Sequence, residues 1–137
     1  MPTVTEFTIQ LEDRPGMLGK LCRAIADRSV NIVAFQSFLE ERGKSAVRLV
    51  TDNPTATRIV LNAEQTTHSE MQVAKTSLPH HPGSLASAAE KLGEAHININ
   101  YAYAGIEPET DTPVVIFGVA EVDRAAKLLD EVAKKAA

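Results

Sequence analysis

Hydrophobic and polar residues alternate near the start of the chain and then change to a helical spacing. Residues 7–11 alternate between apolar and polar side chains, which predicts a half-buried strand. The strand ends at the sequence Asp-Arg-Pro-Gly, and we expect Pro15 in the first turn of a helix with Asp13 as its cap. The helix has one apolar stripe, which is formed by Leu18, Leu21, Cys22 and Ile25.

Residues 31–51 predict a β-hairpin that is followed by a second helix. The segment 31–39 is rich in Ile, Val and Phe, residues 40–44 are typical of a turn, and residues 45–51 form the returning strand. Residues 52–54 open the second helix. Its predicted apolar stripe consists of Ala56, Ile59, Val60 and Ala63.

The chain is similar to itself at an offset of 67 residues. At that offset Pro15-Gly16 aligns with Pro82-Gly83 and Asn31 aligns with Asn98. The same offset pairs Val47 with Val114, Leu49 with Ile116, and Leu61 with Leu128. We therefore predict two copies of one small domain, residues 1–69 and 70–137, with the strand 66–78 shared between them.

The second copy repeats the element order of the first. We expect a strand over 70–78, a helix, strands over 97–104 and 113–118, and a last helix. The inward residues predicted for the two helices are Leu85, Ala88, Ala89 and Leu92, then Val122, Ala125, Leu129 and Val132. Tyr101 and Tyr103 are expected on the same strand face as Ile97 and Ile99, as packing residues rather than a ligand lid.

Helices with one apolar face and a sheet with one polar face bury their apolar residues by stacking the helices on one side of the sheet. This predicts an α+β fold. Right-handed crossovers place the first strand beside the third, which is the ferredoxin-like arrangement of an antiparallel sheet.

Composition and charge exclude several classes of protein. The net charge is −4 and only 4% of residues are aromatic, so the clustered cations and stacking platforms of a nucleic-acid-binding surface are missing. No apolar run is long enough to cross a membrane, and the start does not resemble a secretory signal, so we expect a cytoplasmic protein. The single cysteine, Cys22, rules out an internal disulfide.

Two glycines mark candidate binding loops. Gly16 and Gly83 stand where a strand passes into a helix, and the first N–H groups of a helix have no partner within it. These donors and the positive helix end suit a carboxylate, and a glycine lets a ligand approach. Asn31 and Asn98 open the following strands and offer both a donor and an acceptor. The loops therefore suit a zwitterion such as an amino acid, although each motif is also common as simple capping or as a turn.

These motifs resemble the ACT domain, a small regulatory module of amino-acid metabolism. The resemblance is carried by FTIQLEDRPGMLGKLCRAIADRSVNIVAFQS in the first copy and AKTSLPHHPGSLASAAEKLGEAHININYAYA in the second. It implies tandem β-α-β-β-α-β domains that hold a small amino acid at domain interfaces. The implied ligand-binding residues are Asp13, Arg14, Pro15, Gly16, Met17, Leu18 and Asn31, then His80, His81, Pro82, Gly83, Ser84, Leu85 and Asn98.

The two loops differ in charge. Serine-binding members of the family carry an amide where this chain has Asp13 and His80, so the sequence does not name the ligand. Asp13 favours an ammonium group, whereas His80 and His81 are neutral or cationic near neutral pH. We therefore expect two unequal sites.

We expect a regulatory protein without catalysis and without a cofactor, which binds a small amino acid and acts on an enzyme of amino-acid metabolism. Exposed sheet edges predict a homodimer. Two alternatives stay open at this point. One is a nickel- or zinc-responsive sensor that uses the histidines His68, His80, His81 and His96, and the other is an interaction module with both loops empty.

Overall fold

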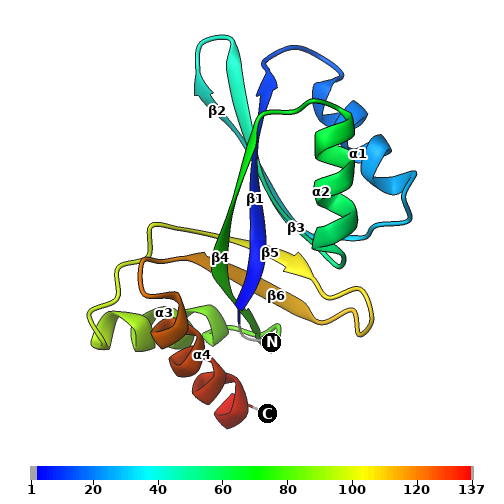
Figure 1. Cartoon of the computed structure of the whole chain (residues 1–137). Helices are drawn as coiled ribbons and strands as arrows, with labels where there is room; N and C mark the ends of the chain where they lie inside the picture. The colour runs from blue at the N-terminus through cyan, green and yellow to red at the C-terminus, as the bar shows by residue number, and fades with distance from the viewer. Residues whose placement is uncertain (1–2, 137) are drawn as a thin grey trace. The chain divides into compact units, whose positions relative to one another are not determined.

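The computed structural model describes residues 3–136, with side chains up to residue 133. The chain divides into two compact units, Thr5–Met71 and Gln72–Ala137 with Met1–Val4. We refer to them as the N-terminal unit and the C-terminal unit. Both contain helices and strands in the order β-α-β-β-α (Figure 1). The two predicted ACT-like domains, residues 1–69 and 70–137, have similar boundaries to these units, but whether each is an ACT-like domain stays a prediction.

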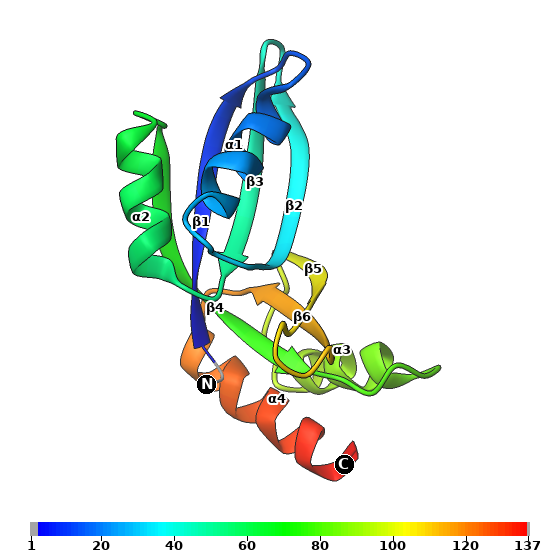
Figure 2. The ribbon, with the colours of Figure 1, turned by 90° about the vertical axis from the view of Figure 1, so that its right-hand side faces the viewer.

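The N-terminal unit is an antiparallel sheet with two helices. Its elements are β1 (Thr3–Glu12), α1 (Met17–Ala26), β2 (Ile32–Glu41), β3 (Lys44–Thr51), α2 (Pro54–Ala63) and the start of β4 (His68–Ser77). β3 lies between β1 and β2 and is antiparallel to both. The predicted placement of the first strand beside the third is therefore confirmed. Figure 2 shows the loop before α1 beside the tip of the β2–β3 hairpin.

One hydrophobic core joins the sheet to both helices of the N-terminal unit. Its residues are Phe7, Ile9, Leu21, Ile25, Val30, Val47, Leu49, Val60 and Leu61. Side chains of a strand alternate between faces, so this cluster shows that α1 and α2 cover the same face of the sheet. The view in Figure 1 agrees, with both helices on one side of β1 and β3. The α+β layering predicted from the pattern is confirmed.

The C-terminal unit has the same layers. Its elements are the rest of β4, then α3 (Ser84–Glu94), β5 (Tyr101–Ile106), β6 (Pro113–Gly118) and α4 (Val122–Ala136). β6 pairs antiparallel with both β4 and β5. The core contains Ala74, Leu78, Ala88, Leu92, Ile97, Phe117, Val119, Ala125 and Leu129.

The start of α1 differs from the prediction. Gly16 is the N-cap, with φ +91°, and no side chain caps the helix, so Asp13 is not its cap. Pro15 precedes the helix instead of lying in its first turn. The left-handed backbone at Gly16 turns the chain between the strand and the helix, and a glycine adopts that conformation without steric cost.

Two of the predicted helix stripes are also wrong in part. Ile59 is 49% exposed, and α2 buries Thr57, Val60 and Leu61 instead of Ile59 and Ala63. The hydroxyl of Thr57 is hydrogen-bonded to that of Thr51 at 2.8 Å, which turns this face of α2 toward the sheet. In α3, Leu85 is 55% exposed. The core contains Ala88 and Leu92 of this helix, but not Leu85 in its first turn.

The offset between the units changes inside the hairpins. The helix-facing residues of β3 are Val47 and Leu49, and those of β6 are Val115 and Phe117, which is an offset of 68 and not 67. The cause is the turn. Residues 40–44 join the paired residues Leu39 and Ser45, whereas residues 107–112 join Ile106 and Pro113, so the second turn is one residue longer. The predicted pairing of positions from Val47 onward is therefore wrong by one residue.

The two tyrosines of β5 lie on the other face from the one predicted. Tyr101 pairs with Gly118 and Tyr103 with Ile116, whereas their neighbour Ala102 pairs with the helix-facing Phe117. Cross-strand partners share a face, so the tyrosines point away from the helices. Residues 97–100 form no regular strand, and this irregular segment changes the alternation that the sequence predicts.

Candidate functional site

The loop between β1 and α1 is fixed at the tip of the β2–β3 hairpin. The N–H group of Asp13 donates to the carbonyl of Gly43 at 3.1 Å, and that of Arg14 donates to the carbonyl of Glu12 at 3.0 Å. β1 and β3 are paired up to Glu12 and Lys44. Pairing of these strand ends therefore determines where the loop lies.

The N-terminus of α1 faces this loop without a side-chain cap. The Gly16 carbonyl accepts the N–H of Lys20 at 3.0 Å, which closes the first helical turn. The earlier N–H groups of a helix have no partner within it and carry the positive end of the helix dipole. The first turn therefore offers donors to an anionic group of a ligand.

A pocket of about 280 Å³ opens beside the loop, and all of its lining residues belong to the N-terminal unit. The loop and the first turn of α1 contribute Asp13, Arg14, Met17 and Leu18. The adjoining strands contribute Leu11, Glu12, Ser37, Phe38, Leu39 and Ser45. The volume lies just below the range usual for drug-sized ligands, so the pocket suits a small molecule.

The pocket is lined by both negatively and positively charged side chains. The Nε atom of Arg14 donates to the Glu12 carboxylate at 2.7 Å, and both side chains are exposed. That bond uses only Nε, so the terminal guanidinium nitrogens can still donate. Asp13 adds a second carboxylate beside them. The pocket can therefore meet an anionic and a cationic group of one ligand.

Six pocket residues were not predicted as site residues from the sequence. Leu11 and Glu12 come from the end of β1. Ser37, Phe38 and Leu39 come from the end of β2, and Ser45 comes from β3. Phe38 also lies under the guanidinium of Arg48, 4.6 Å from the ring centre, and Arg48 donates to Gln36 at 2.8 Å. The signal that could have found these residues is the strand pairing, because it brings the hairpin tip to the loop.

Asn31 lies away from the loop of its own unit. Its N–H donates to Oδ1 of Asp52 at 2.9 Å, and its carbonyl accepts the N–H of Asp52 at 3.0 Å. This pair is at the open end of the hairpin. β3 separates that end from the tip by roughly 25 Å at the usual rise of a strand. The structure therefore does not bring Asn31 and Asp13 together within one unit.

The corresponding loop of the C-terminal unit contains internal hydrogen bonds. Gly83 is the N-cap of α3, with φ +91° like Gly16. The hydroxyl of Ser84 lies 3.1 Å from Nδ1 of His81, and the same nitrogen lies 3.1 Å from the carbonyl of Pro82. The N–H of Ser84 donates to the His81 carbonyl at 3.3 Å. His80, His81 and Pro82 are exposed at this turn.

Asn98 also differs from its predicted setting. It lies in the irregular segment before β5, three residues ahead of the strand, and its amide donates to the side chain of Asn100 at 3.2 Å. The prediction that Asn98 opens the strand is therefore wrong. Leu85 next to the loop is exposed and does not pack into the core.

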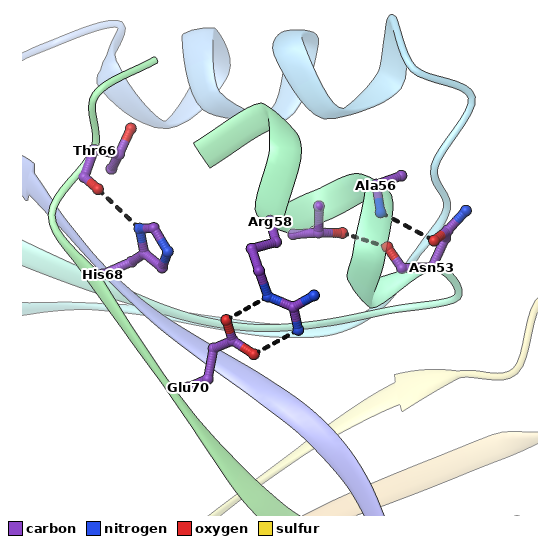
Figure 3. Close-up of polar contacts among 7 residues, drawn as sticks. Asn53, Ala56, Arg58, Thr66, His68 and Glu70 are labelled. Atoms are coloured by element: carbon purple, nitrogen blue, oxygen red, sulfur yellow. Dashed lines mark hydrogen bonds and ion pairs between the residues drawn. The ribbon is translucent and has the colours of Figure 1, made fainter. Parts of the chain in front are cut away.

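The histidines do not form a cluster with other metal ligands. Within the part of the chain that the structure describes, no three His, Cys, Asp or Glu side chains are close enough to hold a metal ion. His68 bonds through Nδ1 to the carbonyl of Thr66 at 2.8 Å (Figure 3). His80 and His81 are exposed on the C-terminal unit.

Cys22 is half-buried on α1, and burial raises the pKa of its thiol above that of an ordinary cysteine. A raised pKa lowers the fraction of thiolate, which is the reactive form. No helix among the described residues is long and apolar enough to cross a membrane.

Comparisons with known proteins identify the fold, and one domain family matches part of the chain. A structure of a Bacteroides thetaiotaomicron protein matches over 97% of this chain and 89% of its own, with a TM-score of 0.81 and 22% identity. The ligand-free regulatory subunit of aspartate kinase from Thermus thermophilus matches over 96% of this chain and 92% of its own, with a TM-score of 0.64 and 14% identity. The same subunit from Thermus flavus matches over 99% and 93%, with a TM-score of 0.59 and 13% identity.

At these identities the solved structures show the shared α+β fold. A search of curated protein sequences finds no match. The ACT domain family matches residues 5–68, which contain the β1–α1 loop and all residues of the pocket. The match does not extend to residues 70–137, so a second ACT-like domain there stays a prediction. Residues 5–68, somewhat less than half of this chain, are therefore similar to an ACT domain.

Proposed function

We propose that residues 5–68 form an ACT domain, and that it is a regulatory module that binds a small amino acid in the pocket beside the β1–α1 loop. The observation that carries the proposal is the pocket itself, which joins an uncapped helix N-terminus to carboxylates of both Glu12 and Asp13. A zwitterion is complementary to that arrangement. Its carboxylate would accept from the first turn of α1 and from Arg14, and its ammonium would donate to Asp13.

The binding role is proposed as non-catalytic. Cys22 has a raised pKa and does not line the pocket. The pocket residues with hydroxyl groups are Ser37 and Ser45, and no histidine lines the pocket with them. A histidine that would activate such a hydroxyl as a nucleophile is therefore missing from the pocket lining. No cofactor enters the proposal.

We further propose that occupancy is transmitted to an enzyme of amino-acid metabolism. Two of the similar solved structures are regulatory subunits of aspartate kinase, which supports a role in regulating an enzyme. Exposed apolar side chains on both units, among them Phe35, Leu39 and Ile106, support association into a homodimer. Light scattering is expected to give twice the chain mass of 14.8 kDa, and a particle of the chain mass would contradict a dimer.

The C-terminal unit is proposed as a second, unequal ACT-like domain. It shares the element order, and Gly83 has the same backbone conformation as Gly16. Its loop differs because His81 and Ser84 are hydrogen-bonded to each other there. We therefore expect one tight site per chain, formed by the N-terminal loop, and equilibrium dialysis that found two identical sites would contradict this.

Thermal denaturation in the presence of each of the twenty amino acids tests the proposed function. A ligand at one hundred times its dissociation constant stabilises the native state by about 2.7 kcal/mol, which is a readily measured shift. The variant Ser37→Phe, which fills the pocket from an exposed strand position, is expected to abolish the shift. Ser77→Phe is the matched control, since Ser77 is an exposed strand residue of the other unit.

The result also distinguishes the alternatives. A shift with nickel or zinc and with no amino acid would replace the proposal with a metal sensor. The absence of any shift, together with a stable complex on pull-down, would favour an interaction module. A shift that survives Ser37→Phe would show that an amino acid binds elsewhere.

A further inference from the structure

We infer that the amino acid bound beside the β1–α1 loop has an apolar, aliphatic side chain, of the size of valine, leucine or methionine. The inference rests on the proposed function and names the class of ligand. It depends on which parts of the pocket wall are charged and which are apolar.

The charged groups of the pocket come from three successive residues. Glu12, Asp13 and Arg14 lie at the end of β1 and in the loop, next to the first turn of α1. Arg14 and Glu12 are bound to each other, which leaves Asp13 as the carboxylate without a described ion pair. Among the described pocket residues, the polar groups of a ligand backbone therefore have their charged partners on this one segment.

Apolar side chains also line the pocket, beside the polar ones. Leu11, Met17, Leu18, Phe38 and Leu39 come from β1, α1 and β2. Leu11 and Leu18 also pack against the core of the unit, whereas Leu39 is 64% exposed. A ligand side chain that covers Leu39 would remove apolar surface from water on both partners, and this stabilises the complex.

Other classes of amino acid fit this wall less well. An acidic side chain would add a third carboxylate beside Glu12 and Asp13, and like charges repel. A lysine side chain would have to bring its ammonium group against Leu11, Leu18 and Phe38, which costs free energy unless the charge is paired. A glycine or alanine would leave the apolar wall in contact with water.

Isothermal titration with a graded series tests the inference. We expect affinity to rise from glycine through alanine and valine to leucine, with leucine roughly tenfold to a hundredfold tighter than alanine. Aspartate and lysine are expected to bind more weakly than leucine. Leucine methyl ester and 4-methylpentanoate, which lack the carboxylate and the ammonium charge respectively, are both expected to bind at least tenfold more weakly than leucine.

A variant separates the side-chain contact from the rest of the site. Leu39→Asp changes an exposed strand residue, so the unit is expected to fold, and it should remove the preference for leucine over glycine. Ile106→Asp is the matched control, because Ile106 is an apolar strand residue of similar exposure, 57%, that does not line the pocket. The ratio of leucine to glycine affinity is the readout, because a change in dimerisation would alter both affinities together.

The outcomes are distinct. Equal affinity along the series, or tightest binding of aspartate or lysine, would overturn the inference while the proposed function stands. An unchanged ratio in Leu39→Asp would also overturn it. If no amino acid binds the wild-type chain, both the inference and the proposed function fail.

Discussion

The ring of Tyr101 lies over the α-carbon of Gly118, its partner across the β5–β6 pair. A β-carbon at Gly118 would overlap the ring atoms Cζ, Cε1 and Cε2. The ring of Tyr103 is stacked beside that of Tyr101, with centres 6.3 Å apart and planes inclined by 10°. The glycine is therefore required by the close approach of an aromatic ring and not by its backbone angles.

Gly118→Ala is expected to destabilise the C-terminal unit by about 1–3 kcal/mol, because the added methyl group overpacks this face of the sheet. Chemical denaturation measures the loss. In a double-mutant cycle with Tyr101→Ala, the destabilisation caused by Gly118→Ala should fall to a small fraction of its value in the wild-type background, since the overlapping ring is gone. Additive losses would show that Tyr101 does not cause the cost.

The two loop glycines should cost the same amount when they are replaced. Gly16 and Gly83 both have φ +91°, and a β-carbon at either position would meet nothing within 4 Å. Only backbone strain is left, so Gly16→Ala and Gly83→Ala are each expected to lose about 1–2 kcal/mol. Unequal losses, measured by urea denaturation, would reveal a contact at one loop that the other does not have.

The ion pair between Arg58 and Glu70 should make stability depend on pH. Arg58 donates to both carboxylate oxygens of Glu70 at 2.7 Å (Figure 3), and this hydrogen bonding holds the pKa of Glu70 below its usual 4.5. Because the pKa is lowered in the folded state, the pair stabilises the fold above pH 4.5 and loses that effect as the pH falls through the folded value. Wild type should therefore exceed Glu70→Gln in melting temperature near neutral pH.

The difference in melting temperature between wild type and Glu70→Gln should vanish in acid, where Glu70 is protonated. It should also shrink in high salt, because both side chains of the pair are partly exposed. In the Arg58→Met background the same Glu70→Gln change should have a smaller pH-dependent effect, because the hydrogen bond from Arg58 is the largest cause of the lowered pKa. A difference between wild type and Glu70→Gln that is constant from pH 7 to pH 3 would contradict this assignment.

The N-cap of α2 should contribute measurably to stability. The side chain of Asn53 accepts the N–H of Ala56 at 3.0 Å (Figure 3). Pro54 follows at the first helical position. Asn53→Ala is expected to cost about 1 kcal/mol, and Asn53→Asp should keep the cap. Asn62→Ala, at an exposed position in the last turn of the same helix, is the matched control and is expected to be neutral or slightly stabilising.

Local patterns were sufficient for the layers of the fold. The alternation at Phe7 and Ile9 and the helical spacing of Leu21 and Ile25 predicted the residues that form one core in the structure. They could not predict that α2 would bury Thr57 instead of Ile59. The buried face includes Leu61 and the hydrogen bond of Thr57 to Thr51, and both depend on contacts with other elements that the local pattern does not contain.

The candidate site was predicted only along one segment of the chain. The Pro-Gly motif indicated the loop with Asp13, Arg14, Met17 and Leu18, which line the pocket. Phe38 and Leu39 were missed because their contribution depends on the pairing of β1 with β3 and of β3 with β2. Asn31 was expected beside the loop, but the same pairing carries it to the far end of the hairpin.

The sequence by itself determined the order of strands and helices, the two glycine turns and the α+β layers, because each of these follows from periodicity and backbone conformation within about ten neighbouring residues. Only the tertiary structure decided which side chains surround the pocket and which face Tyr101 occupies. Those features depend on strand register and on one additional residue in a turn, and a shift of one residue moves a side chain to the opposite face of a sheet.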